Sequence, residues 1–219
     1  MSAPDAAAAE VAQQHDDSGS TRPAGRSLEG EKAQRIIDAM RSSVARRGST
    51  GSTFDHVSRE AGVSRGLLHY YFGTKEQLLA ETVRRDCELR LERLEGQLST
   101  AQTSDDFISL MAQTLGETIS QDPDFITLIF ELFTLSRRNP EIAAEYEDLI
   151  RRTREHVTRM LAAAGRDGVL TLHEEPDAVA EILFSLGDGM ALRMLSEPDR
   201  DYTATMRAAV KCARALLSD

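Results

Sequence analysis

The chain has 219 residues, of which 41% are hydrophobic and 28% charged, a composition typical of a soluble globular protein. No run approaches the roughly 20 apolar residues that a membrane span needs, and the first residues lack the pattern of an export signal. We therefore expect a cytoplasmic protein without membrane contact. Cys87 and Cys212 lie far apart and outside any Cys/His cluster, so we expect no zinc, other metal or cofactor.

The net charge of −10 is unfavourable for binding to nucleic acid, but the charge is unevenly distributed. Residues 31–85 contain ten Lys and Arg against six Asp and Glu. A basic segment on an acidic body would turn one face of the molecule toward phosphate. Ordinary scatter of surface charge is the alternative, and this excess alone does not decide between them.

Residues 1–28 form a low-complexity segment rich in Ala, Gln, Asp, Ser, Gly and Pro. Such a segment has too little apolar surface to order itself, so we expect a disordered arm. Its Arg22 and Arg26 are candidates for minor-groove contacts, and a passive tail is the alternative.

Residues 31–47 have apolar side chains three and four positions apart, which predicts a helix that the glycine-containing segment 48–51 interrupts. Two short helices follow. Thr53 is a suitable N-cap for the second helix, which runs to residue 61, and Ser64 caps the third, residues 65–72.

Gly62 ends the second helix, because glycine adopts a left-handed backbone at little cost. Thr74 and Gln77 form a capping-box pattern for a fourth helix, which runs to about residue 98. Further amphipathic helices are expected at residues 105–120, 123–138, 140–164, 177–195 and 202–217, with Pro123, Pro140, Pro176 and Pro198 at or just before their starts. No segment alternates with the period of a strand, so the predicted fold is all-α with about nine helices.

Residues 53–76 have the layout of a helix-turn-helix DNA reader, with two short helices around a tight turn, an aromatic cluster and a lysine that starts the next helix. The guanidinium of Arg65 matches the O6 and N7 acceptors of guanine, and Leu67 can contact a thymine methyl group. The other polar and aromatic residues are suited to phosphate contacts, which set the register. The residues expected to contact DNA are Thr53, Asp55, His56, Ser64, Arg65, Gly66, Leu67, His69, Tyr70, Tyr71 and Lys75.

Each of these assignments has an alternative. Tyr71 and Phe72 are equally suited to burial between helices. Arg65 and Lys75 can be solvated surface charges, and His56 can be a surface histidine without a role.

The motif resembles the N-terminal domain of the tetracycline-repressor (TetR) family of bacterial transcription regulators. The resemblance covers about residues 31–79 and rests on Thr53, Val57, the run Ala61-Gly62-Val63-Ser64, Gly66, Leu68, Tyr70, Phe72, Lys75, Glu76 and Leu78. It implies that the third helix enters the major groove and that Thr53, the aromatic residues near Tyr70, and Lys75 contact phosphates. The chain departs from the family pattern at Ser58, where Ala is usual, and at His69, where Tyr is usual.

The resemblance also implies a ligand pocket in the C-terminal half that is coupled through the fourth helix to the DNA-reading heads. The candidate pocket residues are Phe107, Met111, Leu115, Phe125, Leu128, Ile129, Phe133, Met160, Phe184 and Met190, with Arg137, His156, His173 and Asp188 as possible polar contacts. Apolar residues at helical spacing are also what a plain core contains, which is the alternative. The chain has no Trp, the side chain best suited to cation–π recognition.

The last two helices carry apolar stripes with nearby glycines, which predicts that they pair across a dimer as a four-helix interface. The expected interface residues are Ile182, Leu186, Gly189, Met206, Val210 and Leu217. Alternatively, these stripes face the core of their own subunit. Two-fold pairing would place the reading helices about one DNA turn, ~34 Å, apart and predicts a palindromic operator.

We divide the chain into the arm (1–28), a helix-turn-helix domain (29–75), a connecting helix (76–98) and a ligand-binding and dimerisation domain (99–219). The expected function is that of a homodimeric repressor that a small apolar or amphipathic effector releases from double-stranded DNA. An all-α enzyme is disfavoured, because H-E-x-x-H, P-loop and G-x-S-x-G motifs are missing and the five histidines are scattered. A helical ligand carrier or interaction module of the same fold without DNA binding is the other alternative.

Overall fold

The computed structural model describes residues 30–218, which form nine helices and no strand. The helices are α1 (Gly30–Gly51), α2 (Phe54–Ala61), α3 (Arg65–Phe72), α4 (Lys75–Leu98), α5 (Ser104–Gln121), α6 (Pro123–Ser136), α7 (Pro140–Arg166), α8 (Pro176–Ser196) and α9 (Thr203–Leu217). The predicted all-α class is confirmed over this range. The predicted arm lies outside the described residues, and none of the nine helices is long and apolar enough to cross a membrane.

Capping residues set the boundaries of the short helices, as the sequence predicts. The hydroxyls of Thr53 and Ser64 each accept a hydrogen bond from a backbone N–H in the first turn of α2 and α3, at 3.3 and 3.2 Å. Gly62 ends α2 with a φ of 66°, in the left-handed region. Thr74 and Gln77 form the expected capping box at the start of α4.

The predicted interruption after the first helix is a break within α1. Gly48 has a φ of 68° and a ψ of 171°, a conformation that favours glycine. The last residues of α1 therefore leave the axis of the preceding helix. The backbone carbonyl of Gly48 accepts a hydrogen bond from the hydroxyl of Ser52 at 2.9 Å, which holds the chain as it approaches α2.

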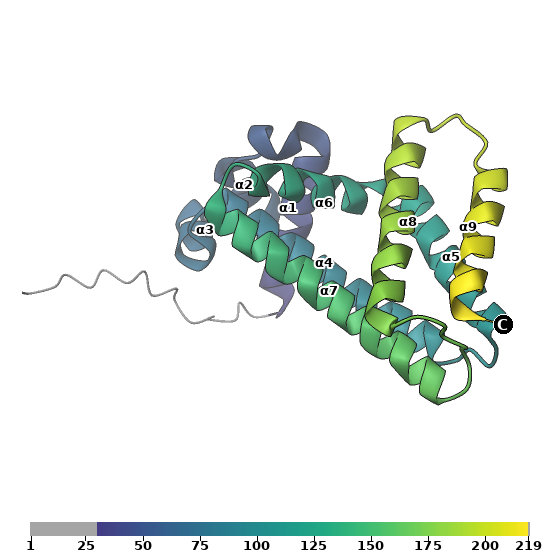
Figure 1. The fold of residues 1–219 in the computed structure, drawn as a ribbon. Helices are drawn as coiled ribbons and strands as arrows, with labels where there is room; N and C mark the ends of the chain where they lie inside the picture. The colour runs from purple at the N-terminus through teal and green to yellow at the C-terminus, as the bar shows by residue number, and fades with distance from the viewer. Residues whose placement is uncertain (1–29, 219) are drawn as a thin grey trace, which may run out of the picture.

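The long helices α4 and α7 run side by side and join the two ends of the molecule (Figure 1). Helices α1, α2 and α3, which we call the head, lie at one end, and α5, α8 and α9 lie toward the other. Helix α6 packs against α1, α4 and α7. The head is therefore held to the rest of the protein by α4 and α6.

Two clusters of buried side chains stabilise the two ends. We call the first the head core; it is built mainly from α1 to α4, α6 and α7, with Ile119 of α5 and Ala191 of α8, and it includes Met40, Val57, Leu68, Leu78 and Leu132. The second, the distal core, lies between α4, α5, α7, α8 and α9 and includes Phe107, Ile108, Leu161, Val179 and Leu217. Because α4 and α7 contribute to both cores, a shift of either helix is felt at both ends of the molecule.

Leu68 joins α3 to the head core and is fully buried. Leu68→Ala should lower the free energy of unfolding by about 2–5 kcal/mol, because it leaves a cavity as well as losing apolar contact. Urea unfolding followed by circular dichroism measures this change. Leu89→Ala in α4 is the matched control, since Leu89 is 51% exposed and should change stability by less than about 1 kcal/mol. Equal losses in the two variants would contradict this description of the head core.

Candidate DNA interface and ligand cavity

One side of α3 is open to solvent while the opposite side anchors the helix. Arg65, Gly66, His69 and Tyr70 are exposed, and their spacing places them on one face of the helix. Leu68 points into the head core from the other face. A Cβ atom at Gly66 would meet nothing within 4 Å, so the backbone there is accessible to a large partner. The face is suited to lie in a groove of DNA.

The guanidinium of Arg65 is held loosely on this face. Its Nη1 lies 3.3 Å from Oδ1 of Asp55, and its Nε donates to Nε2 of His69 at 3.3 Å. The side chains of Arg65 and Asp55 are 59% and 58% exposed, so this ion pair contributes little to stability. Arg65 can therefore leave Asp55 for a base edge at low cost, and its role as a guanine reader stays a prediction.

The predicted phosphate contact Lys75 has partners within the chain. Its Nζ donates to the backbone carbonyls of Ser49 and Thr50, at 2.9 and 3.3 Å, and its side chain is 30% exposed. Lys75 thus ties the start of α4 to the end of α1. A phosphate contact by Lys75 stays a prediction, and it would compete with these two hydrogen bonds.

The remaining predicted DNA contacts differ in how accessible they are. The hydroxyls of Thr53 and Ser64 cap α2 and α3, although both residues are exposed. Leu67 and Tyr71 are partly buried against the head core. In the absence of DNA, Tyr71 therefore packs between helices, which is the alternative given for it above. Nδ1 of His56 is buried and has no hydrogen-bond partner among residues 30–218.

A cavity of about 340 Å³ lies between the head core and the distal core. Its walls come from α4 to α9 and are predominantly apolar. Six of the ten residues expected in a ligand pocket line it: Met111, Leu115, Phe125, Ile129, Phe184 and Met190. The polar candidate Asp188 also lines it, whereas Arg137, His156 and His173 do not.

The other four expected pocket residues lie elsewhere. Leu128 is fully buried in the head core, and Phe107 and Met160 are buried in the distal core. Phe133 is 45% exposed, and its ring lies 5.8 Å from that of Tyr146. These four residues do not line the cavity. Helical spacing of apolar residues could not predict this, because it is the same for residues in a core and residues around a pocket.

Several cavity residues are not among the sequence-based candidates. Cys87, Leu91 and Leu94 line the cavity from the apolar face of α4. This apolar stripe is visible in the sequence, but it fits a packed connecting helix as well as a cavity wall. Burial raises the pKa of Cys87 to about 12, with a smaller contribution from the charge of Asp86, so this thiol is inert as a nucleophile. The sequence does not predict Arg90 as a cavity residue, because a single arginine on a helix is usually a solvated surface residue.

Arg90 belongs to a group of four charged side chains that we call the ionic bridge: Arg41, Asp86, Arg90 and Asp122. Arg41, on α1, donates through Nη2 to both carboxylate oxygens of Asp122 at 2.8 and 2.7 Å, and its Nη1 lies 3.0 Å from Oδ2 of Asp86 on α4. Arg90 pairs with the same Asp122. Asp122 lies between α5 and α6, so the ionic bridge joins the head to α4 and to this junction.

The guanidinium of Arg90 also connects the ionic bridge to the cavity. It lines the cavity wall and lies 3.9 Å from the centre of the Phe125 ring, a cation–π contact. Phe125 lines the same wall. The cavity wall therefore contains a side chain that is connected to Arg41 in the head through two ion pairs, both of them to Asp122.

The carboxylates of the ionic bridge are in unequal environments. Burial opposes the ionisation of Asp122, but the hydrogen bonds and charge of Arg41 and the charge of Arg90 outweigh it and lower the pKa of Asp122. Burial raises the pKa of Asp86, even though Arg41 and Arg90 act against that shift. Oδ2 of Asp86 lies near Arg41 without the geometry of a hydrogen bond. Asp122 is therefore the better-satisfied acid and the centre of the ionic bridge.

The predicted dimer residues fall into two groups. Ile182 is 49% exposed and Gly189 is exposed on α8. Leu186, Met206 and Val210 line the cavity, and Leu217 is fully buried in the distal core. The inward stripe of α9 thus serves its own subunit, and the assignment of Leu217 to an interface is wrong because no part of it is accessible.

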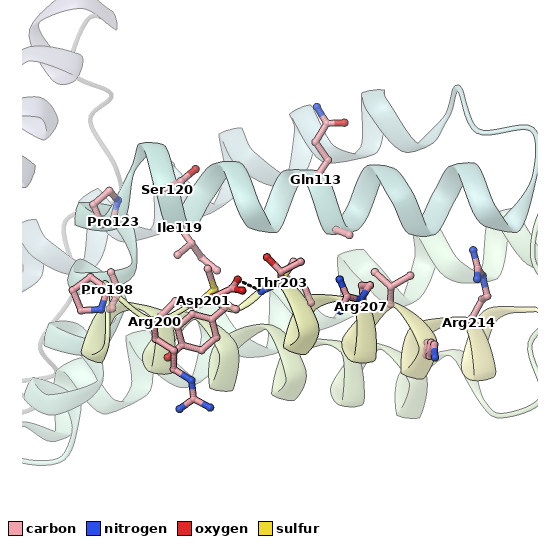
Figure 2. A pocket seen from close by; sticks show the side chains of 17 residues that line it. Gln113, Ile119, Ser120, Pro123, Pro198, Arg200, Asp201, Thr203, Arg207 and Arg214 are labelled. Carbon is pink, nitrogen blue, oxygen red and sulfur yellow. Dashed lines mark hydrogen bonds between the residues drawn. The ribbon is translucent and has the colours of Figure 1, made fainter.

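A surface groove of about 1170 Å³ runs between α5 and α9 (Figure 2). Gln113, Ile119 and Ser120 of α5 lie along one side, and Arg207 and Arg214 belong to α9 on the other. The groove shares Ala112, Met206 and Val210 with the inner cavity, so these side chains form the wall between the two spaces.

An exposed helix-turn-helix face and a separate apolar cavity are the two features typical of a ligand-responsive DNA-binding regulator. The chain belongs to the TetR family: the model of the bacterial regulatory proteins of the tetR family matches residues 36–82, and that of the tetracyclin repressor-like C-terminal domain matches residues 102–216. The family predicted from residues 31–79 is confirmed. The protein is thus a DNA-binding transcriptional regulator.

Individual relatives agree with this assignment. The HTH-type transcriptional regulator BetI of Brucella canis is 26% identical over 194 residues, which cover 80% of this chain and 97% of BetI. A putative transcriptional regulator from Saccharomonospora viridis, solved with choline, superposes with a TM-score of 0.69 at 22% identity over 87% of this chain and all of its own. FadR from Bacillus subtilis, solved with stearoyl-CoA, has a TM-score of 0.69 at 18% identity over 82% of this chain and 96% of its own. Both structures share the fold.

Asp122→Asn should lower the free energy of unfolding by about 1–3 kcal/mol at pH 7, because two arginines lose a charged acceptor. The lowered pKa of Asp122 means that this contribution is complete above the ordinary aspartate pKa of about 3.9 and is lost as the pH falls through the lowered value. The difference between variant and wild type should therefore shrink in acid. Urea unfolding at a series of pH values tests both points.

Asp105→Asn is the matched control, because Asp105 pairs with Arg214 at 2.8 Å but its side chain is 65% exposed. It should change stability by less than about 1 kcal/mol at any pH. A loss in Asp122→Asn no larger than in Asp105→Asn would show that the ionic bridge does not stabilise the fold.

Proposed function

We propose that this regulator is a homodimeric repressor that binds an operator with two-fold symmetry and leaves it when a small effector fills the cavity. The observation that carries the proposal is the position of Arg90. This side chain lines the cavity and pairs with Asp122, which also binds Arg41 in the head. The alternative is an activator, in which a filled cavity would strengthen operator binding instead of weakening it.

In the proposed mechanism, the effector acts on the head through the ionic bridge. An occupant that displaces the ring of Phe125 or the guanidinium of Arg90 changes how Asp122 is neutralised. Arg41, which contacts both carboxylates, must then follow Asp122 or keep only its contact with Asp86, and α1 shifts with it. An effector changes the head only by binding its two positions with different affinity, so coupling of about 1–3 kcal/mol is the expected range.

The head, about residues 29–75, supplies DNA recognition. We assign α3 to the major groove, with Arg65 at a base edge and the exposed Tyr70 at the backbone, since both lie on the open face of the helix. The connecting helix (76–98) acts as a lever that transmits movement between the cavity and the head. Residues 99–219 form the ligand-binding and dimerisation part. The shared packing of α4 in both cores supports its assignment as the lever.

We assign dimerisation to the outer faces of α8 and α9. On α8 one stripe of exposed positions has a spacing of four and three residues and consists of small or apolar residues: Ala178, Ile182, Ser185, Gly189 and Leu192. Exposed charged residues flank this stripe, among them Asp177, Glu181, Asp188 and Arg193. Ile182 and Leu192 are 49% and 48% exposed, which is unfavourable in an isolated chain. On α9, Ala208, Cys212 and Ala215 are exposed at similar spacing. Small residues permit close approach of four helices about a two-fold axis.

Selection of DNA ligands from a random pool by the purified full-length protein tests the proposed function. We expect an enriched sequence with inverted half-sites, bound by two chains, with centres about one helical turn apart. An enriched sequence without two-fold symmetry would contradict the dimer. No enrichment over competitor DNA would favour the alternative of a ligand carrier with the same fold.

Arg65→Ala should weaken binding to the selected operator by about 1–3 kcal/mol and relax the preference at one position of each half-site. Arg151→Ala is the control, because Arg151 is an exposed arginine of α7 with only local ion pairs. Fluorescence anisotropy with matched and substituted operators measures both effects. If Arg65→Ala weakens all sequences equally, then Arg65 contacts phosphate rather than a base.

Ile182→Glu should convert the dimer to a monomer at micromolar concentration, because it places like charges opposite each other in the proposed interface. Ile150→Glu makes the same change on α7, where Ile150 is 43% exposed, and should leave the dimer intact. Sedimentation velocity separates the two states. Dimers of unchanged affinity in Ile182→Glu would move the interface away from α8.

A further inference from the structure

We propose that Asp188 of α8 is the counter-ion for a positively charged, amphipathic effector in the cavity. The inference rests on the proposed ligand-responsive function and adds the chemical class of the effector.

The cavity wall contains two charged side chains, Arg90 and Asp188. Arg90 is already neutralised by Asp122, and its guanidinium faces the ring of Phe125. Asp188 has no hydrogen bond and no ion pair with any residue from 30 to 218. The charge that the wall leaves unsatisfied is therefore negative.

The surroundings of Asp188 make a cation favourable there. Asp188 is exposed in the single chain, yet loss of hydration on the side that lines the cavity raises the pKa of Asp188, and the charge of Glu181 adds to the shift. Burial raises the pKa of Tyr146, and the charge of Asp188 raises it further, which places the two groups within electrostatic reach. A cationic group beside Asp188 would offset both the lost hydration and the repulsion from Glu181.

The rest of the cavity fits an apolar body with a cationic head. Phe130, Tyr146 and Phe184 line the wall, and the faces of aromatic rings attract ammonium groups. Met111 and Met190 supply adaptable surface for an alkyl or aryl chain. The volume of about 340 Å³ lies near the lower end of the range of roughly 300–1,000 Å³ that is usual for small-molecule sites.

An anionic head would be disfavoured in the same space. It would lie near the unpaired carboxylate of Asp188, and it would compete with Asp122 for Arg90. Two structures of the same fold were solved with ligands of opposite character, choline and stearoyl-CoA. The charges in this cavity match the first kind of head group.

Calorimetric titration of the full-length protein without DNA tests the inference. The probes are octyltrimethylammonium, octanoate and octanol, which share a chain length and differ in charge. We expect the cation to bind at least about tenfold more tightly than the anion. Asp188→Asn should weaken binding of the cation about tenfold and leave octanol unchanged, since only a charge is removed. Asp177→Asn is the matched control, because Asp177 is exposed on the same helix and does not line the cavity.

Octanoate binding as tightly as the cation, an Asp188→Asn variant that binds the cation like wild type, or no binding by any of the three probes would overturn the inference. Thermal unfolding of Asp188→Asn shows whether the variant is folded. Operator binding by the same preparations is measured separately. Retained operator binding with failed cation binding would overturn the assigned effector class and leave the DNA-binding function standing.

Discussion

The ion pairs around Asp122 are the contacts on which the rest of the structure depends. One carboxylate, at the junction of α5 and α6, neutralises an arginine of the head and an arginine of the cavity wall. Half-buried charges are tolerated only when they are paired, so neither arginine can move without a response from the other. Burial raises the pKa of Asp86, so Asp86 is a weaker partner for Arg41 than Asp122 is. Arg41 thus has two carboxylate partners of unequal strength, and we propose that a change in their balance moves α1 between two positions.

The division of the apolar core gives this switch room to act. A protein interior that is packed throughout resists displacement, whereas a space between two cores allows one to move relative to the other. The cavity lies at that boundary, and α4 and α7 cross it. We propose that an occupant changes the angle between the head and the distal helices without disrupting either core.

Much of the head could be predicted from sequence because its structure is decided locally. Thr53, Ser64 and Thr74 cap helices through hydroxyls three residues from their partners, and Gly62 supplies a conformation that few residues adopt. The cavity was predicted only in part, since periodicity cannot separate Leu128 in a core from Leu115 at a wall. The ionic bridge could not be predicted, because Arg41 and Asp122 are 81 positions apart. The same holds for Lys75, whose carbonyl partners lie 25 and 26 residues earlier.

Hydrogen–deuterium exchange of wild type and Arg90→Met tests the central claim, that the cavity wall and the head are connected through Asp122. The substitution removes the guanidinium at the wall, yet Arg90 makes no hydrogen bond or ion pair with α1 in the structure. If the cavity wall and the head are connected through Asp122, amide exchange should be faster around Arg41 in α1 and in the adjoining α2, as well as near residue 90. Faster exchange confined to α4 and α6, with α1 and α2 unchanged, would contradict it.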